Sequence, residues 1–238
     1  MKKILLLFTI GIVIAATAFY LYVLLTVGDS DGQQENVEQF SFPAEPLIDK
    51  NQNTEENIRL VRNEYQSFVV QNAGTYSWKQ FANNGREIPL DHGLIALNVS
   101  VPNALQELLK QSDWGIQSCP GNVEKPTFIF RTQVKLMPPD YVGNLYEDQQ
   151  RIMAQWEDSL FEDVQSVLFP TQYHGTVLDT GTFRFDETYE GYAIRSKPIT
   201  FTNGSKLPIA YLLLGDFVLI SNDIDCLVES SESLIEGD

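Results

Sequence analysis

The sequence predicts an α+β protein with an N-terminal transmembrane helix, followed by helices and a mostly antiparallel sheet that a long helix packs against. Residues 4–27 are apolar and carry no charge, which is typical of a membrane span. Residues 144–168 carry apolar side chains four residues apart, which is the pattern of an amphipathic helix. Residues 182–221 alternate or form apolar runs separated by glycine-containing turns, which predicts antiparallel strands.

The apolar stretch at residues 4–27 predicts a membrane anchor. As a helix, these 24 residues would extend about 36 Å, enough to cross a hydrocarbon core of about 30 Å. Lys2 and Lys3 precede the stretch and acidic residues follow it, so we expect residues 1–3 in the cytoplasm and the rest outside. Cleavage after Ala18 as a signal peptide is the alternative, although the apolar run continues far beyond that position.

Charge and composition predict how the rest of the chain is organised. Residues 28–48 are acidic and contain two prolines, which indicates a linker. Residues 49–235 form the predicted extracytoplasmic α+β domain, and residues 236–238 form a tail. The net charge of −16 argues against nucleic acid as a partner, because phosphate backbones require a positive surface. The predicted partners are the membrane, through residues 4–27, and a protein of the cell envelope.

Three helices are predicted before the first long strand. The first begins near Thr54 and buries one apolar face. A second, short helix follows Ser77 and ends at an Asn-Asn-Gly sequence, and a third spans residues 100–109. Strands are predicted at residues 115–118 and 127–136.

The second half begins with the long helix at about 144–168. Its apolar stripe comprises Ile152, Trp156, Leu160, Val164 and Leu168. Strands follow at 182–189 and 191–196, and Asn203-Gly204 predicts a hairpin turn. Residues 209–214 and 217–220 are two apolar runs joined by Gly215-Asp216, which predicts a central hairpin covered on both faces. The last predicted helix contains Ile224, Leu227, Val228 and Leu234.

No catalytic, cofactor or metal-binding motif stands out, and none is predicted. The two histidines, His92 and His174, are each next to a glycine, which suggests loops. Residues 177–181 (VLDTG) have the form of an aspartic-protease motif, and the Leu-Leu-Gly at 213–215 resembles its supporting segment. Asp179 is therefore the one alternative catalytic residue, and it would act as part of a homodimer sharing a proton. Cys119 and Cys226 either form one disulfide or remain two buried thiols.

Three segments resemble a recurring exported domain: residues 156–169 (WEDSLFEDVQSVLF), 188–196 (TYEGYAIRS) and 207–234 (LPIAYLLLGDFVLISNDIDCLVESSESL). They are similar to uncharacterised single-pass membrane-anchored proteins of uncultured bacteria with small genomes. In those proteins a tryptophan-containing helix precedes a Tyr-x-Gly-x-x-Ile-Arg strand, which Tyr189, Gly191, Ile194 and Arg195 match. Residues 77–89 (SWKQFANNGREIP) resemble a short helical segment upstream. The resemblance extends over residues 43–234 and implies an exported location and an α+β fold, without an activity.

Three functions are consistent with these observations. The first is a membrane-tethered extracytoplasmic domain with a binding or structural role at the cell envelope. The second is an envelope enzyme, an aspartic-protease-like hydrolase that uses Asp179. The third is an extracytoplasmic ligand-sensing domain, although residues 1–3 leave almost no cytoplasmic part to transmit a signal.

Overall fold

The computed structural model describes residues 54–72, 77–120, 125–133, 145–169, 176–189 and 192–236. All of them belong to one compact unit, Glu38–Asp238. The predicted anchor at residues 4–27 and the whole of the predicted linker at 28–48 belong to no described range. Within the described ranges, no helix combines the length and the apolar character needed to span a membrane.

The described part of the chain is built on an eight-stranded sheet in which every pair is antiparallel. The strand order is β1-β4-β5-β10-β9-β8-β6, and β7 also pairs with β8. The strands are β1 (Ser77–Lys79), β4 (Leu109–Ser118), β5 (Pro126–Thr132), β6 (Val177–Thr180), β7 (Arg184–Tyr189), β8 (Tyr192–Phe201), β9 (Lys206–Leu214) and β10 (Phe217–Ser221). A separate two-stranded hairpin pairs β2 (Ala82–Asn83) with β3 (Arg86–Glu87). The predicted α+β class and antiparallel sheet are confirmed.

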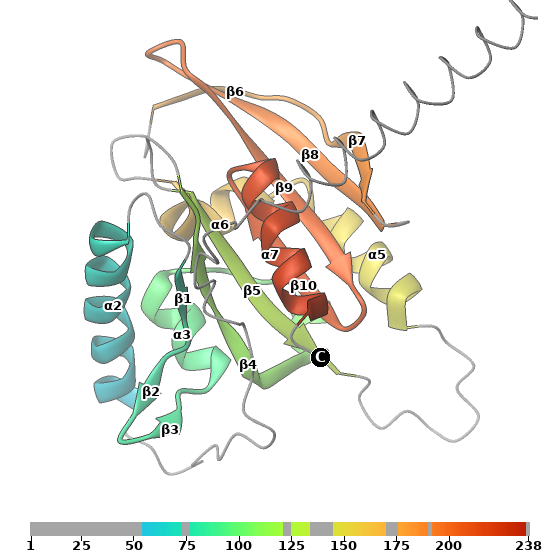
Figure 1. The fold of residues 1–238 in the computed structure, drawn as a ribbon. Helices are drawn as coiled ribbons and strands as arrows, with labels where there is room; N and C mark the ends of the chain where they lie inside the picture. Colours follow the sequence, from blue (N-terminus) through green and yellow to red (C-terminus); the bar gives the residue numbers. More distant parts are fainter. Residues whose placement is uncertain are drawn as a thin grey trace, which may run out of the picture. The chain divides into compact units, whose positions relative to one another are not determined.

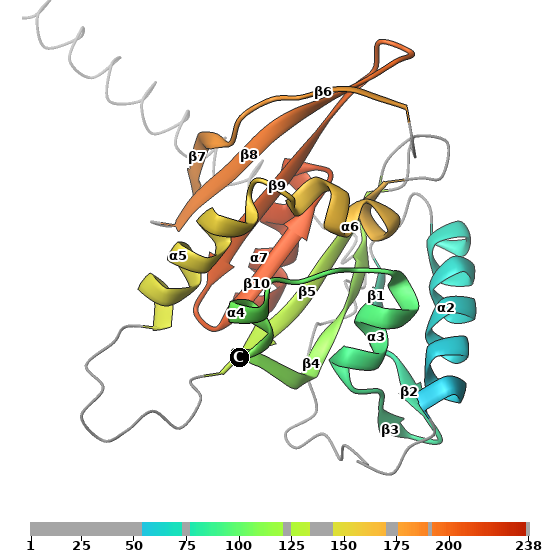
Figure 2. The same cartoon turned by 180° about the vertical axis from the view of Figure 1, so that it is seen from behind.

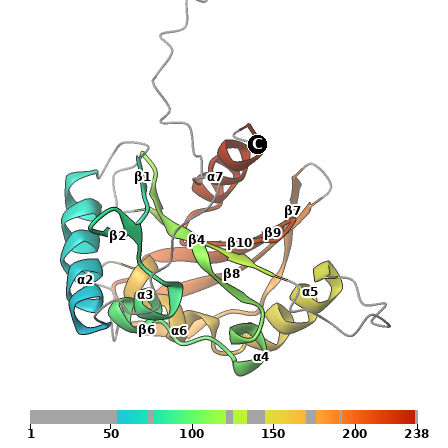
Figure 3. The same ribbon diagram turned by 90° about the horizontal axis from the view of Figure 1, so that it is seen from below.

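Helices cover both faces of this sheet (Figures 1 and 3). They are α2 (Thr54–Gln71), α3 (Leu90–Leu97), α4 (Asn103–Gln106), α5 (Leu145–Trp156), α6 (Leu160–Leu168) and α7 (Ile224–Glu236). Helix α7 lies on one face, over β5, β9 and β10, and encloses the smaller core with them. Helices α3, α4, α5 and α6 lie on the other face, where the larger core sits (Figure 2).

The β9–β10 hairpin is central, as the sequence predicts. Leu214 pairs with Phe217, and Gly215 supplies the left-handed backbone conformation of the turn, with φ of 58°. Along β10, Val218 and Ile220 enter the larger core, whereas Leu219 enters the smaller one. Both faces are therefore buried, which explains why these runs are apolar at almost every position.

The single long helix predicted at 144–168 is wrong, because two helices occupy this segment. Helix α5 ends at Trp156 and α6 begins at Leu160. At the break, Trp156 Nε1 and Ser159 Oγ both donate hydrogen bonds to Asp163 Oδ2, at 2.8 Å and 2.7 Å. Such local bonds from polar side chains compete with a continuous helix. The break brings Glu157 to the sheet, where it contacts Arg195 and Tyr211.

The short helix predicted after Ser77 is also wrong, because this segment forms β1 and the β2–β3 hairpin. The Asn-Gly sequence that was expected to end a helix is the hairpin turn, with Asn84 and Gly85 both at positive φ. Phe81 is fully buried and stacks on Trp114 with 5.1 Å between ring centroids. Pairing with distant β4 therefore outweighs the local helical pattern.

Several predicted boundaries also differ from the structure. The helix predicted at 100–109 is reduced to the short α4, because Leu109 already begins β4. Helix α3 was not predicted. The strands expected at 115–118 and 191–196 are parts of the longer β4 and β8, while the strand expected at 182–189 begins at Arg184. Strand β5 ends at Thr132, and residues 134–136 belong to no described range.

The close packing of β1 on β4 makes Gly115 intolerant of a side chain. A Cβ at this position would lie 2.4 Å from the Lys79 carbonyl oxygen and 2.4 Å from the Trp78 ring. We expect Gly115→Ala to lower the free energy of unfolding by about 2–3 kcal/mol, because the main chain cannot move away. Chemical denaturation measures this, with Gly204→Ala as the control. A Cβ there meets open space, and only the φ of 83° opposes it, at a cost of about 1 kcal/mol. Equal losses in the two variants would contradict the close packing.

Candidate functional site

The candidate site begins with a row of side chains across three neighbouring strands. In the register of β7, β8 and β9, Phe185 is paired with Arg195, and Arg195 is paired with Tyr211. Paired residues of an antiparallel sheet point to the same face. The Arg195 guanidinium lies 4.6 Å from the centroid of the Phe185 ring, which is a cation–π distance.

Glu157, in the turn between α5 and α6, lies against this row. Its Oε1 accepts hydrogen bonds from Arg195 Nε at 2.5 Å and from Tyr211 Oη at 2.7 Å. Its Oε2 accepts a bond from Arg195 Nη2 at 2.8 Å, so the arginine contact is bidentate. The side chains of Arg195 and Glu157 are only 24% and 14% exposed.

Lys197, two residues further along β8, extends the cluster. Its Nζ donates to the main-chain oxygen of Glu157 at 3.2 Å and lies 5.0 Å from the Phe183 ring centroid. The Phe183 ring lies 5.7 Å from the Tyr211 ring. Glu157, Phe183, Phe185, Arg195, Lys197 and Tyr211 together form what we call the Glu157 cluster. In this cluster each cation is placed against an aromatic ring on one side and Glu157 on the other.

Three groups of the cluster, Tyr211, Arg195 and Lys197, have pKa values shifted from their ordinary values. Burial, reinforced by the bond donated to Glu157, raises the pKa of Tyr211 far above its ordinary value. The hydrogen bond to Glu157 raises the pKa of Arg195, against the effect of burial. Burial lowers the pKa of Lys197, while Glu162, Asp158 and Glu157 oppose that change. Both carboxylate oxygens of Glu157 already accept hydrogen bonds, so this arrangement fixes side chains in place and is poorly suited to moving a proton.

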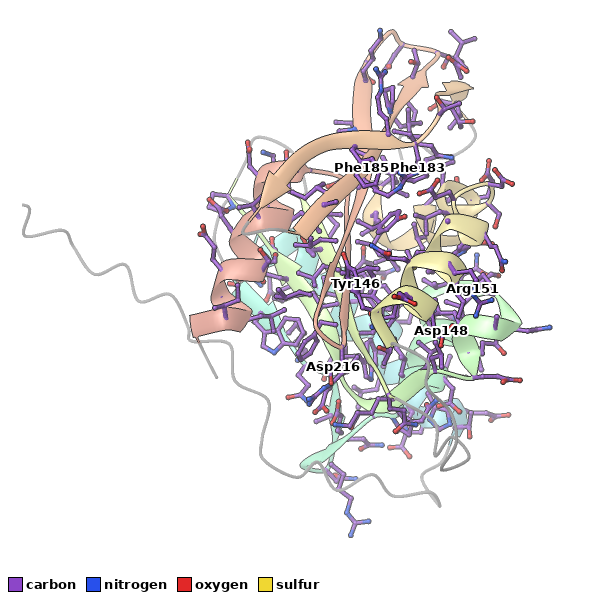
Figure 4. All side chains as sticks on the ribbon, turned by 90° about the vertical axis from the view of Figure 1, so that its right-hand side faces the viewer. Tyr146, Asp148, Arg151, Phe183, Phe185 and Asp216 are labelled. Carbon is purple, nitrogen blue, oxygen red and sulfur yellow. A yellow bond between two sulfur atoms is a disulfide. The ribbon has the colours of Figure 1, made fainter. Side chains whose placement is uncertain are left out.

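The cluster borders a surface that combines aromatic and charged side chains. Phe185 is 65% exposed, although its ring covers Arg195. Figure 4 shows Phe183 and Phe185 next to each other, above the helix that carries Tyr146, Asp148 and Arg151. On that helix, Arg151 Nη2 and Asp148 Oδ1 form an ion pair at 2.8 Å.

Three of the four segments quoted for the resemblance converge at this cluster. Glu157 comes from residues 156–169, Arg195 from 188–196 and Tyr211 from 207–234. Arg195 belongs to the Tyr-x-Gly-x-x-Ile-Arg strand motif, but its pairing with Glu157 was not predicted from the sequence. The separations along the chain are 38 and 54 residues, and no local pattern reports such a contact.

A second polar cluster surrounds the irregular register between β4 and β5. Asp113 has a φ of 63°, in the left-handed region that non-glycine residues rarely adopt, and it is buried. Lys110 Nζ forms an ion pair with its carboxylate. Arg131 lies between the carboxylates of Asp113, at 3.4 Å, and Asp216, at 2.5 Å. The Asp113 N–H donates to Glu87 Oε1 at 2.7 Å, so all these groups brace one another.

Glu87 gives this second cluster a pH dependence. Burial raises its pKa above the ordinary value of 4.5, although hydrogen bonds from Gln80 and the Asp113 N–H lower it. Between 4.5 and that raised pKa the folded protein holds more protons than the unfolded chain, so stability falls as pH rises. We expect Glu87→Gln to remove this pH dependence, which amounts to at most about 1.4 kcal/mol per pH unit, because an amide does not titrate. The hydrogen bond from the Asp113 N–H is kept, because the amide oxygen still accepts it.

Denaturation of wild type and Glu87→Gln in parallel, from pH 4 upwards, measures the difference. The wild type should lose stability relative to the variant as pH rises through this window. Parallel pH profiles of the two proteins would show that Glu87 carries no shifted titration.

The structure does not bring the two parts of the protease-like motif together. Asp179 lies on β6 with its side chain exposed, opposite Thr200. Thr200 is in turn opposite Lys206, at the start of β9, whereas the Leu-Leu-Gly at 213–215 is at its other end. Asp179 is therefore level with Lys206, and about eight residues of β9, or about 26 Å, separate that end of the strand from the Leu-Leu-Gly segment. Asp179 therefore has no Leu-Leu-Gly segment to support it within this domain.

The other candidate residues have structural surroundings. The ring nitrogens of His92 lie 3.2 Å from Thr54 Oγ1 and 3.1 Å from Asn57 Nδ2, so both take part in joining α2 to α3. His174 belongs to no described range. Cys119 and Cys226 form a disulfide with a Cα–Cα distance of 5.7 Å. In the described ranges, no group of three or more His, Cys, Asp or Glu side chains is placed to hold a metal ion.

Comparisons with known proteins found no relative of this chain. No protein-family model matches the chain, and neither a curated protein nor a solved structure matches it significantly.

Proposed function

We propose that this chain is a membrane-anchored, exported domain with a binding role at the cell envelope. The disulfide between Cys119 and Cys226 carries the proposal. It joins residues 107 positions apart, and both cysteines are at most 2% exposed. Disulfides of this kind persist in oxidising compartments and are rare in the cytosol.

Two features of the sequence support the proposed membrane anchor and linker. The apolar residues 4–27 follow Lys2 and Lys3, which favours a cytoplasmic N-terminus and an exported domain. The acidic residues 28–48 suit a solvated spacer between the bilayer and the domain, because like charges extend a linker.

The geometry of the Glu157 cluster supports binding over catalysis. Both of its carboxylate oxygens already accept hydrogen bonds, while the Phe185 ring is 65% exposed above a fixed arginine. Exposed aromatic rings and arginines are the residues that most often contribute binding energy to protein interfaces. We therefore assign this surface to a protein partner of the envelope.

Protease accessibility tests the topology. Full-length protein with a C-terminal tag is produced in bacterial cells, and intact spheroplasts are treated with a protease. We expect the tag to be lost while a cytoplasmic marker survives, because the domain lies outside. A tag that is protected until the membrane is broken would overturn the proposal.

Thiol labelling of the same cells tests the disulfide independently. The chain has only two cysteines, so denatured protein should react with a maleimide at two positions after reduction and at none before. Labelling of both cysteines without a reductant would remove the observation on which the proposal depends.

Site-specific photo-crosslinking tests the binding surface. A benzoyl-phenylalanine at position 185 should give one discrete adduct, and the same group at Glu232 should not. Glu232 is an exposed position on α7, on the opposite face of the sheet. No adduct, or the same adduct at both positions, would contradict a partner at this surface.

A further inference from the structure

A polar pocket lies between α2 and β1 and has no part in the Glu157 cluster. Its volume is about 390 Å³, within the range of small-molecule sites. The residues that line it are Asn63, Glu64, Ser67, Phe68, Gln71, Asn72 and Lys79. Six of these seven carry a polar or charged side chain.

One wall of the pocket is a regular row of uncharged polar groups. Asn63, Ser67 and Gln71 are spaced four residues apart, so they lie on one face of α2 with about 6 Å between successive positions. All three are exposed. Amide and hydroxyl side chains both donate and accept hydrogen bonds, so this wall offers alternating donors and acceptors.

The rim at the end of α2 and the floor of the pocket are held by internal contacts. Asn72 Nδ2 donates to the Phe68 carbonyl at 3.0 Å, and Asn72 Oδ1 accepts a bond from Ser77 Oγ at 2.9 Å. Phe68 is 8% exposed and packs into the larger core, so it gives the pocket an apolar floor. The rim is thus fixed before any ligand arrives, which lowers the cost of binding.

The two charges of the pocket neutralise each other. Lys79 Nζ and Glu64 Oε2 form an ion pair at 2.6 Å across the pocket. A charged ligand would have to break this pair to gain a counter-charge, whereas a neutral ligand can bond to its remaining lone pairs and protons. The pocket therefore favours an uncharged molecule with many groups that both donate and accept hydrogen bonds.

We propose that this pocket binds a neutral saccharide unit. Sugar hydroxyls both donate and accept, which matches the row on α2, and the small exposed part of Phe68 gives the sugar ring one apolar contact at the floor. The proposal rests on the proposed function in one respect, since an exported domain is the kind that meets glycans. Failure of the two can be distinguished, because a titration with sugar does not depend on membrane topology.

The test uses the full-length protein in a detergent without a sugar headgroup. Maltotriose, cellotriose and N,N′,N″-triacetylchitotriose, which are all uncharged, are titrated by calorimetry, with saturation-transfer NMR for weak binding. We expect at least one of them to bind with a Kd of millimolar order or tighter. Absence of binding by all three at about 20 mM would overturn the proposal.

Matched tryptophan variants locate the site. Ser67→Trp fills the pocket and should weaken binding about tenfold or more. Gln66→Trp makes the same change at an exposed neighbouring position of α2 outside the pocket lining, and it should leave binding unchanged. Equal thermal stability of the two variants shows that both are folded. Unchanged binding by Ser67→Trp would place the sugar elsewhere and overturn the assignment.

Discussion

Replacing Cys119 and Cys226 together by alanine is expected to lower the free energy of unfolding by about 4–5 kcal/mol. The disulfide closes a loop of 107 residues, and the entropic gain from restricting the unfolded chain increases with loop length. It also ties α7 to the end of β4, because Cys226 lies in the first turn of α7. Loss of the bond frees the helix that packs over the smaller core.

Denaturant titrations of the full-length protein, with and without a reductant, measure this effect. The wild type should lose most of this stability on reduction, whereas the double variant should not respond to the reductant. Comparing the reduced wild type with the double variant separates the loss of the bond from the loss of two buried side chains. A reduced wild type within about 1 kcal/mol of the oxidised protein would contradict the expected effect.

Prediction from sequence succeeded where the decisive interactions are local. The β9–β10 hairpin was predicted from two apolar runs and Gly215, and both the turn and the central position in the sheet are confirmed. The hairpin at Asn203-Gly204 has the same basis, with Gly204 at a φ of 83°. In both cases the strand pattern and the turn residues predict the same hairpin, so the local sequence is sufficient to predict it.

Prediction failed where residues distant in sequence decide the structure. Residues 77–79 pair with β4, and this contact overrides a pattern that suits a helix. The break between α5 and α6 depends on Asp163 accepting hydrogen bonds from Trp156 and Ser159, which periodicity does not report. The candidate site was missed for the same reason, since its members are brought together only by the sheet register and this break.

The second large effect is expected from breaking the Glu157–Arg195 pair. Arg195→Met should lower the free energy of unfolding by about 2–4 kcal/mol, because it leaves the Glu157 carboxylate largely buried without its charged partner. This is slightly below the range for a fully buried pair, since the two side chains remain 24% and 14% exposed. Arg151→Met is the matched control. Arg151 is 62% exposed in its own ion pair with Asp148, so its loss should cost less than about 1 kcal/mol.

A double-mutant cycle separates the interaction energy between Glu157 and Arg195 from the contribution that each side chain makes by itself. Glu157→Met combined with Arg195→Met removes both charges, so it should be less destabilising than Arg195→Met alone, because the Glu157 carboxylate is no longer left without Arg195. Tyr211 then loses its acceptor, Glu157 Oε1, and Tyr211→Phe in the double background should recover stability by removing that buried hydroxyl. If the losses of the two single variants simply add in the double variant, Glu157 and Arg195 are not coupled, and the cluster does not hold the α5–α6 turn on the sheet.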